Sequence, residues 1–317
     1  MLLDVLWLLS GLALLVGGAE MLVRGAVALA RRFRVPPLVI GLTVVAFGTS
    51  TPELMVNLDS VWRDAPDVGF GNVIGSNIAN IGLLLGITAL MAPLAVHASV
   101  VIREIPMMVL VSLAALVMVV DGLLMGGEAN RLDRGDGLLL LLLFALFLYY
   151  LVADMIKARE QNAAGEQGMM NVWVAAVLIA AGLAGLVLGA HLTVTGAVGL
   201  ARSAGVPEVI IGLTLVAVGT SLPELATSLV AARQGQTDIA VGNIVGSNIF
   251  NLAFILGLTA TIKPMPVPPG GLVDVCVMMG FAVLLLPMAM TRQSISRAEG
   301  AVLLALYIGY ISWLAIR

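Results

Sequence analysis

Long apolar runs separated by short polar breaks follow one another along the whole chain. A membrane-spanning helix needs about 20 apolar residues. On that basis we predict an all-α integral membrane protein with ten transmembrane helices. The predicted spans are 2–23, 37–61, 68–91, 99–120, 136–154, 172–194, 208–232, 239–262, 271–290 and 298–316. The beginning of the first run carries Asp4 and no Lys or Arg, so we interpret it as a retained helix and not as a signal peptide.

Composition agrees with this pattern and narrows the possible functions. Of the 317 residues, 60% are hydrophobic and 11% are charged, and the mean hydropathy is +1.08. A soluble domain carries about a quarter charged residues, so we expect a membrane protein without a separate soluble domain, which excludes most enzyme classes. One cysteine and two histidines exclude an internal disulfide and a Cys/His zinc site. A net charge of -3 gives no basic surface for nucleic acid. We expect no cofactor and infer no obligate protein partner.

The two halves of the chain are repeats of each other. A shift of 171 residues aligns VIGLTVVAFGTSTPEL at 39–54 with IIGLTLVAVGTSLPEL at 210–225, and it aligns the segments 67–86 and 238–257 without a gap. Roughly half of the positions between 37 and 86 are identical to their partners, which indicates a duplication. We therefore predict a five-helix repeat at 1–156, a mobile linker loop at 157–171 and a second five-helix repeat at 172–317.

An odd number of spans per repeat predicts that the two copies are inverted relative to each other in the bilayer. The basic residues agree, because the segment 24–36 carries four arginines and its copy keeps only Arg202. Positive residues concentrate on the cytoplasmic side. We therefore expect a multi-pass cell membrane protein with both termini outside, in the periplasm if the membrane is the inner membrane of a Gram-negative cell.

The second span of each repeat carries GTSTPE or GTSLPE within an apolar stretch, which puts Glu53 and Glu224 near the midplane of the membrane. A carboxylate at that depth is costly and is functional by default. Two further features of these spans supply oxygen atoms. Pro52 and Pro223 each free a backbone carbonyl about four residues earlier, and hydroxyl side chains lie on the same turns. Carbonyl, hydroxyl and carboxylate oxygens suit Na+ and Ca2+. The alternative for GTS-P alone is a kinked packing motif, but packing does not require the Glu. The hydroxyls belong to Thr49, Ser50, Thr220 and Ser221.

The third span of each repeat carries GNVIGSNIAN or GNIVGSNIFN. Its glycines allow close helix approach, and ordinary packing is the alternative reading of that feature. Ser76 and Asn80 are four residues apart and share a helix face, as do Ser247 and Asn251. Polar side chains inside lipid need partners, so we predict that these two stripes line a cation path opposite the Glu-bearing spans.

These doubled motifs resemble the two alpha-repeats of the sodium/calcium exchangers, within the calcium/cation antiporter superfamily, and the whole chain resembles the short prokaryotic members. The resemblance implies ten helices in two inverted halves, four central cation sites, and alternating access that exchanges about three Na+ for one Ca2+. It implies that Glu53 and Glu224 coordinate calcium together with the backbone carbonyls of Thr49 and Thr220. It also implies sodium ligands in two groups, flanked by Asn80 and Asn251. These groups are Ala46, Ser50 and Ser247 on one side and Ala217, Ser221 and Ser76 on the other.

Two departures from related families bear on the counter-ion. Some archaeal and potassium-dependent relatives have Asp at the position of Asn251, so this chain resembles the potassium-independent branch. The GTS-PE motif also differs from the GNA-E type of calcium/proton relatives. A Ca2+/H+ antiporter therefore remains the second hypothesis. An intramembrane hydrolase and a passive channel are further alternatives, which symmetric glutamates and inverted repeats disfavour.

Several polar residues outside these motifs have simpler interpretations. Asn57 and Ser228 follow each Glu by four residues, and their place in the cation path is a secondary hypothesis. We interpret Asp67 and Asp238 as helix N-caps, with attraction of cations at the entrance of the path as a secondary hypothesis. We interpret Glu20, His191, His97 and Asp154 as solvated residues at the ends of spans.

Overall fold

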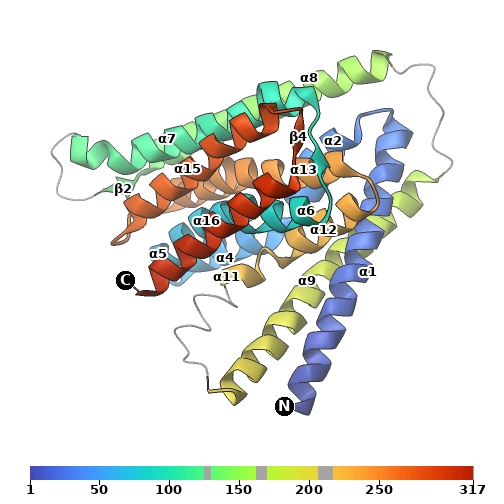
Figure 1. Cartoon of the computed structure of the whole chain (residues 1–317). Helices are drawn as coiled ribbons and strands as arrows, with labels where there is room; N and C mark the ends of the chain where they lie inside the picture. The colour runs from blue at the N-terminus through green and yellow to red at the C-terminus, as the bar shows by residue number, and fades with distance from the viewer. Residues whose placement is uncertain (125–129, 162–169, 206–216, 317) are drawn as a thin grey trace.

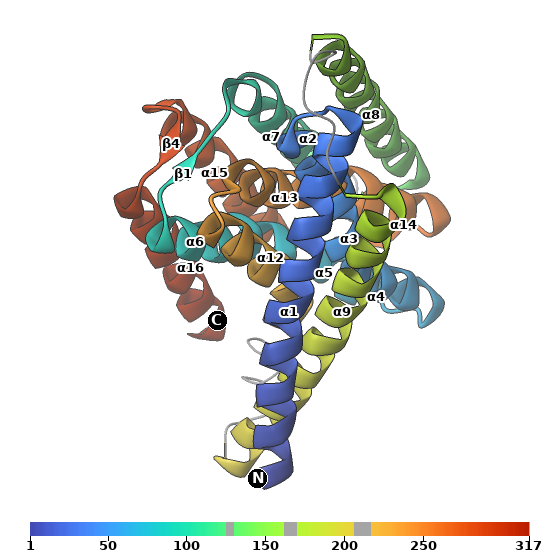
Figure 2. The same ribbon diagram turned by 90° about the vertical axis from the view of Figure 1, so that its right-hand side faces the viewer.

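A pair of long helices, α1 (Leu2–Phe33) and α9 (Val172–Ser203), lie side by side along their length and extend past the other helices, as Figures 1 and 2 show. The computed structural model describes residues 1–124, 130–161, 170–205 and 217–316. The contact between α1 and α9 is close because glycines line it. A Cβ added to Gly18 would come within 2.8 Å of the backbone of α9, and one added to Gly182 within 2.6 Å of the backbone of α1.

Both helices are longer than the predicted spans. The segment 24–36, predicted as a connection, is helical up to Phe33, and the helix ends where Arg34 takes a left-handed conformation with φ of 57°. The segment contains no proline before Pro36 and consists largely of good helix formers, so nothing stops the helix at the membrane surface. Likewise α8 (Arg134–Gln161) includes the first residues of the predicted linker. The rest of that linker, at 162–169, lies outside the described residues, so the mobility of the linker stays a prediction.

The second span is a broken helix. It consists of α2 (Pro37–Ile40), a π-helical turn η1 (Gly41–Val45), α3 (Ala46–Thr49) and α4 (Thr51–Trp62), with a bend of 43° at Ser50. Pro52 explains the bend, because it cannot donate the hydrogen bond that would continue the helix. The equivalent break in the second repeat lies at Ser221, between α11 (Ala217–Gly219) and α12 (Leu222–Arg233). The first part of the predicted span 208–232 lies outside the described residues.

Two helices that carry the Gly-Asn-Ser motifs occupy the centre of the molecule. One runs through α5 (Pro66–Ala79), η2 (Asn80–Leu85) and α6 (Gly86–Met91), and 78% of its most apolar stretch is buried. The other runs through α13 (Thr237–Ile249), η5 (Phe250–Leu256) and α14 (Gly257–Ile262), and 94% is buried. Their polar stripes therefore lie in the protein interior and not against lipid. The predicted N-caps Asp67 and Asp238 lie inside the first turns of these helices, because each helix begins one residue before the aspartate.

The outer helices surround this pair. They are η3 (Val100–Glu104) with α7 (Ile105–Leu124), α8, α15 (Gly271–Met290) and α16 (Arg297–Ile316), and only 17% to 39% of their apolar stretches is buried. Within the described residues, eight helices are long and apolar enough to cross a membrane, and the broken second span makes nine. The apolar exterior is that of a membrane protein.

In the described part of the chain, four two-residue strands, which the apolar pattern did not predict, connect the halves. β1 (Leu94–Ala95) pairs antiparallel with β4 (Ser294–Ile295), and β2 (Arg131–Leu132) pairs with β3 (Met265–Pro266). Helix bounds also repeat with the 171-residue shift, since α4 corresponds to α12 and α6 to α14 residue for residue. In both strand pairs, a strand of the first half is bonded to a strand of the second half.

Candidate cation site

Two glutamates lie in the first turns of two helices that follow the proline breaks. Glu53 is in α4 and is 1% exposed, and Glu224 is in α12 and is 0% exposed. Ser50 and Ser221 lie at the two breaks, and the side chain of each points toward the other repeat. The predicted pair of carboxylates is therefore buried next to the breaks of the two spans, within the GTS-PE motifs.

Each carboxylate accepts a hydrogen bond from a serine of the other repeat. Ser50 Oγ donates to Glu224 Oε1 at 2.9 Å, and Ser221 Oγ donates to Glu53 Oε1 at 3.3 Å. Ser50 Oγ also lies 3.0 Å from Ser247 Oγ. The two GTS-PE motifs thus form one site, in which hydroxyls of each half contact the charge of the other.

Asparagines of the central helices fix the backbone next to these glutamates. Asn72 Nδ2 donates to the carbonyl of Glu53, and Asn243 Nδ2 donates to the carbonyl of Glu224, both at 3.3 Å. Sequence reasoning did not assign these two residues to the site. Their signal was present, because each is the Asn of the Gly-Asn pair that opens the motif in both repeats. They orient the carboxylate-bearing turns.

The secondary candidates, Asn57 and Ser228, are also buried but contact this supporting layer. Asn57 Nδ2 donates to the carbonyl of Glu53 at 3.0 Å. Ser228 Oγ accepts from Asn243 Nδ2 at 3.0 Å. Their hydrogen bonds therefore hold the site residues in position, and none of these bonds reaches a carboxylate oxygen.

Several buried oxygens in the site have no hydrogen-bond partner among the described residues. Burying a polar atom without a partner is costly, so such atoms indicate a ligand. Neither a proton donor nor a cationic side chain of the described chain satisfies them, whereas a hard cation would coordinate oxygens of this kind. They include Glu53 Oε2, Glu224 Oε2, Ser76 Oγ, Asn80 Oδ1 and Asn251 Oδ1, together with Thr220 Oγ1 and Asn57 Oδ1.

The other predicted ligands lie around this set with their own contacts. Thr49 Oγ1 lies 3.0 Å from Asn243 Oδ1, to which it donates. The carbonyl of Ala46 accepts the backbone N–H of Ser50 at 3.0 Å and lies 3.3 Å from Thr49 Oγ1. That carbonyl would have to give up a bond to ligate sodium. Thr220 is partly buried near the break before α12, and Ala217 begins α11, with its side chain outside the described part of the chain.

A cavity of about 380 Å³ reaches one half of this site. Its lining includes Asn72, Ser76 and Thr220, next to Glu53, together with Asp274 and Tyr310 of the outer helices. Among the described residues, no atom lies within 4 Å of a Cβ added to Gly71 or Gly75 of the same helix face. The cavity therefore lies beside the Glu53 half-site.

Comparison with known proteins is consistent with this geometry. A family model described as sodium/calcium exchanger protein matches residues 3–153 and 174–316. The inner membrane protein YrbG of Escherichia coli (strain K12) is 39% identical, with 100% of this chain and 97% of that protein covered. The sodium/calcium exchanger MaX1 of Methanosarcina acetivorans is 32% identical, with 96% of each chain covered. The solved structure of the sodium-calcium exchanger NCX_Mj soaked with Na+ and Sr2+ is similar with a TM-score of 0.82, at 34% identity over 98% of each chain.

Proposed function

The chain belongs to the sodium/calcium exchanger family, and on that premise we propose that it is a secondary antiporter that exchanges Na+ for Ca2+ across the membrane. The observation that carries the proposal is the pair of buried glutamates, each with one carboxylate oxygen that has no partner among the described residues. Two carboxylates balance the charge of one Ca2+. Sodium competes for the same oxygens, because both ions are hard cations.

We assign the ligands by combining the motif with these contacts. Glu53 and Glu224 bind calcium with the carbonyls of Thr49 and Thr220. Sodium binds with oxygens that include Ser50 and Ser221, whose hydroxyls already lie on the carboxylates. The remaining sodium ligands are Ala46, Ser247, Ala217 and Ser76, and Asn80 and Asn251 flank the centre.

Exchange requires that the site open to one side at a time. The cavity beside Glu53 is lined by the start of α5, by Asp274 near the start of α15 and by the end of α16. With ten spans and outside termini, these helix ends all lie on the outside. We therefore propose that the described conformation faces outside, and that the two inverted repeats rock to open the opposite path.

Three Na+ in place of one Ca2+ would leave the site with one excess positive charge. Both midplane carboxylates are used in neutralising Ca2+, so the third Na+ has no counter-charge there. The exchange is then electrogenic, with each elementary charge that crosses the membrane worth about 2.3 kcal/mol per 100 mV.

Calcium uptake into proteoliposomes tests this function against its alternatives. Vesicles loaded with Na+ should accumulate Ca2+, and vesicles loaded with K+ or choline should not. Uptake that follows an imposed pH gradient without Na+ would favour a Ca2+/H+ antiporter instead. Calcium flux that needs no counter-ion at all would indicate a channel.

A further inference from the structure

A third buried carboxylate lies outside the cation site. Glu104, at the end of η3, is only 6% exposed, and its Oε2 has no hydrogen-bond partner among the described residues. The side chain lines a groove of about 400 Å³ between the η3–α7 helix and α8. An unpartnered carboxylate oxygen in a groove wall indicates a ligand that donates hydrogen bonds.

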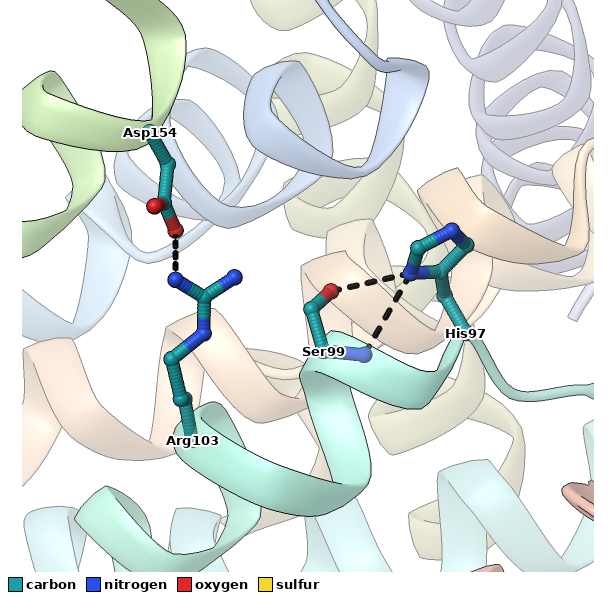
Figure 3. Close-up of polar contacts among 4 residues, drawn as sticks. All are labelled: His97, Ser99, Arg103 and Asp154. Atoms are coloured by element: carbon teal, nitrogen blue, oxygen red, sulfur yellow. Dashed lines mark hydrogen bonds and ion pairs between the residues drawn. The ribbon is translucent and has the colours of Figure 1, made fainter. Parts of the chain in front are cut away.

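Charged side chains cluster at the same end of the groove. Arg103 and Asp154, which both line it, form an ion pair between η3 and α8, as Figure 3 shows. Asp154 was expected to be a solvated boundary residue, but its side chain is only 23% exposed, and that of Arg103 is 46% exposed. Nearby, Nδ1 of His97 accepts the backbone N–H of Ser99 at 3.3 Å. This end of the groove therefore combines one guanidinium with two carboxylates.

The rest of the groove is apolar and faces the lipid side of the helices. Met107, Leu110, Phe147 and Leu151 line it. Leu110 is 47% exposed on a helix whose outer face is apolar, so bilayer lipid can reach the groove. Arg103 and Glu104 lie four and five residues after Ser99, about 6 to 8 Å along a helix at 1.5 Å per residue. That is the depth of the headgroup region for a helix that begins at the membrane surface.

We propose that this groove binds a phospholipid whose headgroup carries a primary ammonium, as in phosphatidylethanolamine. The ammonium donates to Glu104 Oε2 and to Asp154, the phosphate accepts from Arg103, and an acyl chain lies along the apolar wall. A headgroup with net negative charge fits poorly, because two carboxylates face it. A choline headgroup has no N–H to donate, so it leaves Glu104 Oε2 unpartnered.

The second repeat has an equivalent groove that lacks this polar end. It lies between α15 and α16, has a volume of about 410 Å³, and the described residues that line it are uncharged, including Val277, Phe281 and Trp313. With the shift of 171 residues, Val275 stands where the first repeat has Glu104. Both grooves can accommodate acyl chains, but among the described residues only the first has carboxylates in its lining. Asp274, which lies beside the second groove, already accepts a hydrogen bond from Tyr310 at 2.9 Å. The second groove is thus an internal reference for non-specific lipid.

Native mass spectrometry of the full-length protein tests the proposal. The protein is exchanged into nanodiscs of ethanolamine, choline or glycerol phospholipids with the same acyl chains and then released from them. Wild type should retain one ethanolamine lipid about tenfold more than the choline lipid, which is the effect of one charge-assisted hydrogen bond. Glu104→Gln keeps the side-chain volume and should reduce retention to the choline level. Asp59→Asn removes a carboxylate that pairs with Arg63 on an exposed helix end, and it should change nothing.

Two further variants keep the test decisive if Glu104→Gln folds poorly. Asp154→Asn removes the other carboxylate and should weaken ethanolamine selectivity. Leu110→Trp fills the apolar part and should expel the lipid while leaving both carboxylates intact. Equal retention of ethanolamine and choline lipids by wild type, or unchanged selectivity in Asp154→Asn and Leu110→Trp, would overturn the proposal and leave only non-specific acyl chains in the groove.

Discussion

The half-site around Glu224 and the half-site around Glu53 contain the same motif in different surroundings. At Glu224, the hydroxyl of Ser50 is 2.9 Å from the carboxylate and 3.0 Å from Ser247. At Glu53, the corresponding serine is 3.3 Å away, and Ser76 Oγ has no partner among the described residues. One half-site is tightly bonded and the other is looser. Because the serines and glutamates match, the difference arises from the surroundings of the two half-sites.

Glycines of the central helices show the same contrast. A Cβ added to Gly246 would lie 2.9 Å from Ala46 and 3.0 Å from the backbone of Leu42. Its counterpart Gly75 lies against the cavity and meets no described atom within 4 Å. Among the described residues, the motif is therefore packed in one copy and borders a cavity in the other, and we propose that the two halves exchange these roles during the cycle.

Part of the difference is encoded in the sequence. Phe250 packs against Phe47 with ring centroids 4.2 Å apart and against Phe144 at 5.9 Å. Under the 171-residue shift, Phe250 corresponds to Ala79, which lines the cavity. Phe47 corresponds to Val218. The aromatic cluster therefore fills the region that corresponds to the cavity, and it makes the two half-sites unequal in packing as well as in state.

Neutralising one carboxylate in either half-site should have the largest effect. We expect Glu53→Gln and Glu224→Gln each to abolish calcium exchange, since losing one partner of a buried charge pair costs about 2–5 kcal/mol. Calcium uptake into sodium-loaded vesicles measures this, with protein recovered from the membrane as the folding check. Glu20→Gln, at an exposed site paired with Arg24, is the control. Near-normal uptake in either mutant would remove that glutamate from the site.

Membrane voltage should have the next largest effect. The two half-sites contribute one carboxylate each, so Ca2+ occupancy is neutral and occupancy by three Na+ carries one extra charge. At about 2.3 kcal/mol per 100 mV, the equilibrium calcium gradient should change about fiftyfold per 100 mV. An inside-positive potential should accelerate uptake into sodium-loaded vesicles. A gradient that does not depend on voltage would point to two Na+ per Ca2+.

A matched pair of glycine substitutions should shift the conformation in opposite directions. Gly246→Ala inserts a methyl where the described conformation is packed, and such overpacking costs about 1–3 kcal/mol. It should therefore depopulate this conformation. Gly75→Ala adds a methyl beside the cavity and should disfavour only the opposite state, in which this helix face becomes packed.

Thiol labelling inside the cavity measures that shift. Ile311→Cys reports on the cavity in a background where the native thiol is removed by Cys276→Ser. Labelling should become slower with Gly246→Ala and remain as fast or become faster with Gly75→Ala. Equal changes in both variants would mean that the two half-sites do not exchange roles.

The apolar pattern and the doubled motifs were sufficient to predict much of this molecule. The spans of the outer helices, the burial of Glu53 and Glu224 and the proline bend follow from local rules about hydrophobicity and proline. The extension of α1 through Arg24 to Phe33 did not, because arginines are compatible with both a helix end and a connection. The supporting roles of Asn72 and Asn243 required the packing of two distant helices. Which half-site is open cannot be read from matching motifs, since that depends on the conformation.

Among these predictions, acid should have the smallest effect on calcium uptake. It tests whether protons reach the Glu53 half-site through the cavity. Protons and cations compete for the same carboxylate oxygens, so uptake should decline as the pH falls and recover as it rises. In the described conformation the cavity lies beside the Glu53 half-site, whereas at the Glu224 half-site Ser50 Oγ bonds both Glu224 and Ser247. Acid applied on the cavity side should therefore inhibit severalfold, and the inhibition should be relieved by raising Ca2+, because competition for one site is overcome by mass action.

Initial rates measured between mildly acidic and alkaline pH, at low and high Ca2+, test both points. A flat profile would mean that protons do not reach the carboxylates during the cycle, and inhibition that Ca2+ cannot relieve would mean that the protonated group lies outside the cation site.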